Sequence, residues 1–110
     1  MARLATGIWI AAYLRRLQAE GIAVYVTRRG DDTAGAVLVK LATLDGRAVA
    51  LQRSFDLMTG ARAWTTLADG PEAEVDAAIG RQRGFDPDLW VIEIEDREGR
   101  HMLDQPGLEA

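Results

Sequence analysis

The sequence predicts an α+β protein, a two-layer sandwich in which two helices pack against a mostly antiparallel sheet. Apolar residues recur at helical spacing between residues 6 and 20, and four runs with strand-like patterns follow. A second helical pattern then precedes one more strand. The element order is therefore α-β-β-β-β-α-β, which is typical of the α+β class. The length of 110 residues fits a single domain over residues 1–103, with a frayed tail at 104–110.

The first helix is predicted to begin at Thr6, which fits an N-cap, and to stop at Gly21. Ile10 and Leu17 belong to the apolar stripe of this helix. Gly21 fits the left-handed position just after a helix end, where a side chain would clash. Leu17 and Ile22 then stand where the apolar contact that accompanies this cap is made.

Strands are predicted at 22–27 and 62–67, and on either side of Asp45-Gly46 at 36–44 and 47–55. Asp-Gly between two β-like runs signals a hairpin with a two-residue turn, which pairs Ala42 with Val49. One face of this hairpin then carries only apolar side chains: Val37, Val39, Leu41, Ala48 and Ala50. The other face mixes apolar and basic side chains: Leu38, Ala42, Leu44, Val49, Leu51, Phe55, Lys40, Arg47 and Arg53.

The second helix is predicted to begin near Pro71 and to close at Gly84, and the last strand spans 89–95. The two helices can each cover one sheet face in part, or both can cover the apolar face of the hairpin. In the second arrangement an apolar patch stays exposed on the other face, and such a patch marks a partner or ligand surface. We therefore predict a homodimer, an unknown protein partner or a binding groove at this interaction surface: Leu38, Leu44, Val49, Leu51 and Phe55.

The composition excludes several classes of chemistry. With no cysteine, the chain has no disulfide, thiolate zinc site or cysteine nucleophile. It has one histidine, His101, and one serine, Ser54, so we predict no catalytic triad, metal or cofactor. The net charge of -4 lacks the basic footprint of a nucleic-acid-binding protein. No apolar run is long enough to span a membrane and no signal-peptide pattern is present, so we expect a cytoplasmic protein.

Basic residues form two candidate anion sites. Arg28 and Arg29 precede Gly30, and adjacent arginines suit carboxylate or phosphate recognition. The alternative is a solvated turn, which is the commoner role of a surface charge run. Lys40 and Arg53 are diagonal neighbours on the mixed face and could bind an anion in a partly apolar groove. Their alternative role is to cover apolar surface with their stems while their heads reach water or pair with Glu93 or Glu95.

Acidic residues and the histidine offer weaker candidates. Glu93 and Glu95 project from one strand face and could share Mg²⁺ or Ca²⁺, although an acidic face that discourages strand pairing is more common. His101 could act as a base oriented by Glu95 or Asp96, but single histidines near a C-terminus usually lie at the surface. We assign no catalytic or metal-binding role to these residues.

The element order also resembles the core of restriction-endonuclease-like proteins. Those nucleases place an acidic residue two positions before a catalytic lysine, where it holds a metal near the scissile phosphate. The single lysine of this chain is Lys40, and Leu38 stands two positions before it. The diagnostic motif is absent, and likeness of fold does not by itself carry function.

Several stretches resemble an uncharacterised bacterial family known as domain of unknown function 1491, found mainly in alphaproteobacteria. They are GIWIAAYLRRL at 7–17, RRGDDTAGAVLVK at 28–40, LDGR at 44–47 and FDPDLWVIEIEDREGRH at 85–101. Together they cover most of the chain, and the last stretch is long enough to be fairly specific. The resemblance implies a small stand-alone domain, and it assigns no activity, cofactor or catalytic residue.

Two functional hypotheses follow. The first is a binding or interaction module without catalytic activity, homo-oligomeric through a sheet face or edge, which requires an exposed apolar sheet face. The second is a small enzyme or ligand-binding protein that acts on an anionic small molecule or a nucleic-acid phosphate. It requires a pocket in which at least two of Arg28, Arg29, Lys40 and Arg53 converge with a carboxylate or His101.

Overall fold

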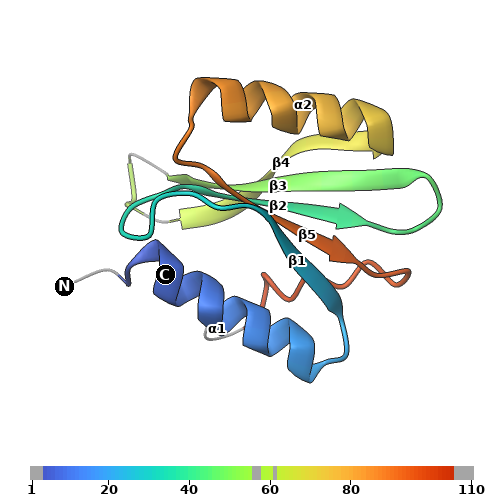
Figure 1. Ribbon diagram of the computed structural model, residues 1–110, viewed down its shortest axis with the longest axis horizontal. Helices are drawn as coiled ribbons and strands as arrows, with labels where there is room; N and C mark the ends of the chain where they lie inside the picture. The colour runs from blue at the N-terminus through green and yellow to red at the C-terminus, as the bar shows by residue number, and fades with distance from the viewer. Residues whose placement is uncertain (1–3, 56–57, 61, 106–110) are drawn as a thin grey trace.

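The computed structural model describes residues 4–55, 58–60 and 62–105, and it confirms the α+β class and the predicted element order (Figure 1). The elements, in chain order, are α1 (Thr6–Ala19), β1 (Ala23–Arg28), β2 (Val37–Ala42), β3 (Arg47–Phe55), β4 (Arg62–Pro71), α2 (Glu72–Phe85) and β5 (Trp90–Glu95). In these ranges no helix is long and apolar enough to cross a membrane.

The sheet has five strands in the order β1-β5-β2-β3-β4. The meander from β2 to β4 is antiparallel, as predicted from the hairpin signals. The last strand, β5, inserts between β1 and β2, antiparallel to the first and parallel to the second. This insertion makes β5 an interior strand beside the central β2 and leaves β1 and β4 as the edges of the sheet.

The two helices lie on opposite faces of the sheet, which settles the choice between the two arrangements (Figure 1). All six residues of β2 are buried, because α1 covers one set of alternating side chains and α2 covers the other. Val37 and Val39 pack with Trp9 of α1, whereas Leu38 packs with Val75 of α2. The protein therefore has three layers, helix, sheet and helix. The predicted two-layer sandwich is wrong in the number of layers, because the two helices do not share one face of the sheet.

The predicted cap at the end of α1 is confirmed. Gly21 has a φ of 71°, the left-handed conformation that glycine adopts without strain. Its N–H donates to Gln18 O over 3.0 Å, and Ile22 N–H donates to Leu17 O over 3.0 Å. Leu17 and Ile22 are both buried, as this cap requires. The start differs, because Thr6 is the first helical residue and its hydroxyl donates to Gly35 O over 2.8 Å.

The predicted hairpin register is wrong by one residue. Ala42 pairs with Ala48, and Thr43 N–H donates to Arg47 O, so the turn holds Leu44 as well as Asp45-Gly46. Leu44 adopts a positive φ of 63°, which is uncommon for a residue with a side chain. A shift of one residue moves every side chain of a strand to the opposite face. The faces predicted for β3 are therefore exchanged.

The chain after β5 returns to the side of the sheet that carries α1. The Tyr13 hydroxyl donates to His101 O over 2.6 Å, and Leu103 is buried in the core beneath α1. Burial raises the pKa of the Tyr13 phenol far above its usual range, so the hydroxyl remains a donor. Asp96 accepts from the backbone N–H and the guanidinium of Arg100 and closes the turn between them.

Candidate functional site

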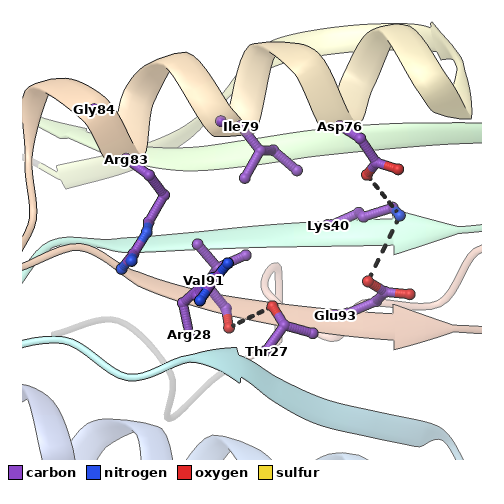
Figure 2. A pocket seen from close by; sticks show the side chains of 10 residues that line it. Thr27, Arg28, Lys40, Asp76, Ile79, Arg83, Gly84, Val91 and Glu93 are labelled. Carbon is purple, nitrogen blue, oxygen red and sulfur yellow. Dashed lines mark hydrogen bonds and ion pairs between the residues drawn. The ribbon is translucent and has the colours of Figure 1, made fainter.

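A groove of about 430 Å³ opens between α2 and the sheet (Figure 2). It lies on the face opposite α1, at the side of the sheet where β5 and β1 run. Its polar lining comes from Thr27, Arg28, Lys40, Asp76, Arg83 and Glu93. Ile79 and Val91 supply the apolar lining, and Gly80 and Gly84 complete the wall on the α2 side.

The groove exists because α2 does not cover the whole face. This helix directly follows β4 and packs on β4 and β3, with Val75 and Ile79 buried against Leu38 and Val91. The edge strand β1 lies beyond the reach of α2, and its residues are almost all exposed. The groove therefore has α2 as one wall and the uncovered part of the sheet as its floor.

Lys40 occupies one end of the groove, where three carboxylates surround its ammonium. Lys40 Nζ lies 2.7 Å from Glu72 Oε2, 2.8 Å from Asp76 Oδ1 and 3.5 Å from Glu93 Oε1. The lysine side chain is 6% exposed, and the carboxylates are partly solvated. One ammonium against three carboxylates gives this cluster a formal charge of -2. We call these four residues the Lys40 cluster.

The Lys40 cluster keeps the ammonium protonated. Burial by itself lowers the pKa of Lys40, but the hydrogen bonds that its ammonium donates to Asp76 and Glu72 and the negative charge of Glu93 outweigh it. The net result is a pKa well above the ordinary value of 10.5. The side chain therefore cannot serve as a neutral amine nucleophile or base near neutral pH. It acts as a fixed cation that ties α2 to β2 and β5.

Two arginines occupy the other end of the groove. Arg28 ends β1 beyond a register shift that follows Val26, and Arg83 comes from the last turn of α2. Figure 2 shows both guanidinium groups on the side of the groove away from Lys40. Arg83 donates to Leu89 O over 3.3 Å. Within the described ranges, neither guanidinium has a carboxylate within ion-pair distance, unlike those of Arg29, Arg47 and Arg100.

Gly80 and Gly84 leave the helix backbone bare along the groove. A Cβ atom at either position would meet no atom within 4 Å, so packing inside the protein does not require glycine there. Glycine inside a helix costs about 1 kcal/mol relative to alanine. Gly84 was predicted to end the helix, but α2 continues through it to Phe85. Both glycines therefore widen the groove at the expense of helix stability.

The structure brings together two of the four predicted anion-binding residues. Arg28 and Lys40 line the groove. Arg29 lies outside it, 3.2 Å from Asp32 and above the ring of Trp90. Arg53 lies on the opposite sheet face, where its guanidinium stands 5.2 Å from the Trp9 ring centroid. Lys40 and Arg53 therefore do not form one site, because the register shift turns the β3 side chains around.

The predicted interaction surface does not form a single patch. Leu38 is fully buried beneath α2, while Val49 and Leu51 lie half-buried on the face that carries α1. Leu44 is exposed at the hairpin turn. Phe55 ends β3, and its side chain lies outside the described part of the structure, as does that of Ser54. Two helices on opposite faces leave no broad apolar sheet face among the described residues.

Glu93 and Glu95 do share one sheet face, as predicted, but Glu93 contacts Lys40 while Glu95 lies beside Tyr25 and raises the pKa of its phenol. The stretches 4–55, 58–60 and 62–105 contain no group of three or more side chains arranged to hold a metal ion. His101 Nδ1 accepts the Leu103 N–H, on the side of the sheet that carries α1. Asp96, its predicted partner, binds Arg100 instead.

Sequence reasoning missed Arg83 and the acidic residues of α2 as members of the site. The sequence does carry a pattern that could have found the acidic residues of α2. Four residues at a spacing of four lie along one flank of this helix: Glu72, Asp76, Gly80 and Gly84. This stripe is acidic in its first half and bare in its second. It marks the flank of α2 that borders the groove.

A family model described as "Protein of unknown function (DUF1491)" matches residues 4–104. A crystal structure of a DUF1491 family protein from Caulobacter crescentus CB15 is 42% identical, with a TM-score of 0.85 over 94% of this chain and 98% of that one. An NMR structure of a DUF1491 family protein from the same organism is 41% identical, with a TM-score of 0.83 over 96% and 97%.

A more distant solution structure, of protein Atu0922 from Agrobacterium tumefaciens, is 32% identical and has a TM-score of 0.72 over 86% of each chain. Among curated proteins no match is found.

Proposed function

Since this chain belongs to the DUF1491 family of proteins of unknown function, we propose its function from its groove: it binds a small anionic ligand without catalysing a reaction. The supporting observation is the pair of guanidinium groups, Arg28 and Arg83, at one end of the groove. Arginine offers a planar set of donors that matches carboxylate and phosphate oxygens. Both line the groove, and among the described residues neither has a carboxylate within ion-pair distance, so a bound anion would offset their positive charge.

The size and lining of the groove support a small-molecule ligand. Its volume of about 430 Å³ lies within the range of typical ligand pockets, roughly 300–1,000 Å³. Such pockets combine apolar surface with a few convergent polar groups. Ile79 and Val91 supply apolar surface here, and Arg28 and Arg83 supply donors at one end, while the Thr27 hydroxyl donates to Val91 O over 3.1 Å.

The protonation of Lys40 and the position of the histidine support a binding role for the groove over a catalytic one. Lys40 is held as an ammonium by three carboxylates, so it lacks the lone pair that a nucleophile or base needs. The histidine lies on the other side of the sheet. The groove thus presents fixed charges rather than a matched acid and base.

We expect inorganic phosphate to bind at the arginine end of the groove. In a titration of ¹⁵N-labelled protein, the amide signals of Thr27, Gly80 and Gly84 shift. Arg28→Gln and Arg83→Gln each weaken binding on the order of tenfold, because each removes a charge-assisted hydrogen bond. Arg47→Gln is the matched control, since it makes the same charge change at an exposed pair with Asp69 outside the groove. Unchanged phosphate affinity in both groove variants would overturn the proposal.

We propose self-association through β1 as a second candidate function. This strand is an open edge of the sheet, and Tyr25 and Val26 on it are 51% and 40% exposed. Pairing of two such edges satisfies their free backbone groups and covers both side chains. Native mass spectrometry then gives a dimer that Val26→Lys converts to a monomer, while Leu44→Lys, at an exposed turn away from β1, leaves the dimer intact. A monomer at all concentrations argues against this candidate.

A further inference from the structure

The two ends of the groove carry opposite charge. Figure 2 shows the guanidinium groups of Arg28 and Arg83 at one end, and Lys40 between Asp76 and Glu93 at the other. The arginine end is formally +2 from its two guanidinium groups, whereas the Lys40 cluster is formally -2. The groove is therefore dipolar along its length.

The acidic end is accessible to a ligand. Asp76 and Glu93 both line the groove, and their side chains are 53% and 25% exposed. The contacts with Lys40 engage Asp76 Oδ1 and Glu93 Oε1, one oxygen of each carboxylate. The ammonium of Lys40 offsets only part of the charge of its three partners. A ligand ammonium near these carboxylates would offset one further unit of this negative charge.

We propose that the ligand is zwitterionic, with its anionic group at Arg28 and Arg83 and its ammonium at Asp76 and Glu93. This inference rests on the proposed anion-binding function and names the ligand class. A dianion would place its second negative charge against the Lys40 cluster, and a diamine would place one ammonium against the guanidinium groups. Both are disfavoured because like charges brought together oppose binding.

The middle of the groove fits an apolar spacer. Along α2, Ile79 stands three residues after Asp76 and four before Arg83, and in the sheet Val91 pairs with Arg28 and precedes Glu93 by two residues. Both are uncharged, buried residues of the α2-side core. Gly80 also lines the groove, and a Cβ atom there would meet no atom within 4 Å other than those of its chain neighbours and its own helix backbone. A methylene chain can lie along this strip with its charged groups at the two ends. The ligand class is therefore an ω-amino acid with a short aliphatic chain.

Four probes of equal chain length test this proposal by calorimetry and NMR titration: 5-aminopentanoate, pentanoate, glutarate and 1,5-diaminopentane. We expect 5-aminopentanoate to bind on the order of tenfold more tightly than pentanoate, because it alone satisfies both ends. Glutarate and the diamine bind more weakly than the zwitterion. Asp76→Asn removes the preference for 5-aminopentanoate and leaves pentanoate binding unchanged, whereas Asp69→Asn, outside the groove, changes neither.

The outcomes separate the two proposals. Equal binding of 5-aminopentanoate and pentanoate, both lost in Arg28→Gln, overturns the zwitterion and leaves the anion site standing. Tighter binding of glutarate than of 5-aminopentanoate likewise overturns the zwitterion and leaves the anion site standing. Tightest binding by the diamine, or binding by none of the four probes and not by inorganic phosphate, overturns both. A preference for 5-aminopentanoate that survives Asp76→Asn also rejects the assigned position of its ammonium.

Discussion

Lys40→Met lowers the free energy of unfolding by about 3 kcal/mol at pH 7. The ammonium is almost fully buried, and its removal leaves Glu72, Asp76 and Glu93 facing one another without their shared cation. Breaking a buried pair by removing one partner typically costs about 3–5 kcal/mol. The lower end applies here because the carboxylates are partly exposed, so water screens their repulsion. Urea denaturation followed by circular dichroism measures the difference.

The pH dependence gives this prediction a second readout. The folded-state pKa of Lys40 is raised, so its stabilising contribution is complete below the unfolded value of 10.5 and is lost as pH rises through the folded value. Between pH 6 and 9 the deficit of Lys40→Met therefore stays constant. Arg47→Met, which breaks an exposed pair with Asp69 at 3.9 Å, costs no more than about 1 kcal/mol. Equal costs for the two variants contradict the prediction.

Trp9→Ala costs about 3–5 kcal/mol of unfolding free energy, the usual range for removing a large aromatic side chain from a core. Trp9 is 2% exposed, and its ring lies 5.0 Å from that of Tyr13 and 5.8 Å from that of Trp64. Arg53 stands over both tryptophan rings. The substitution therefore removes apolar burial, two stacked contacts and part of a cation–π arrangement at once.

Thermal and urea denaturation of Trp9→Ala, followed at the far-UV signal, give the stability loss directly. Ile8→Ala is the matched control, because Ile8 is the preceding residue of the same helix and is 59% exposed. We expect it to change stability by no more than about 0.5 kcal/mol. If Trp9→Ala and Ile8→Ala were equally mild, the packing of α1 on the sheet would not depend on this ring.

Local signals in the chain predicted the elements well because their causes are local. The end of α1 follows from Gly21 and from the apolar contact between Leu17 and Ile22, all within a few residues. The hairpin between β2 and β3 was also signalled locally, by Asp45-Gly46. Its register was not, because Leu44 joins the turn with a positive φ that its side chain disfavours. One residue of error then exchanged the two faces of β3.

The site was less predictable because it joins distant residues. Arg28 and Arg83 line the same groove only because β5 inserts between β1 and β2 and α2 packs on that face of the sheet. No spacing in the chain relates them. Lys40 could be recognised as unusual from its place in an apolar strand, but its partners come from α2 and β5. The prediction that Arg53 shares a sheet face with Lys40 was wrong, because this placement depended on the predicted hairpin register.

The burial of Lys40 has a further consequence for the chemical reactivity of the folded chain. Lys40 is the one lysine in the sequence, and its nitrogen is both protonated and enclosed. Reagents that acylate amines require an accessible neutral amine, so the folded protein presents no reactive lysine to them. Acylation of this nitrogen requires a local opening in which α2 separates from the sheet. The rate at which Lys40 is acylated therefore measures how often α2 separates from the sheet, and no added probe is needed.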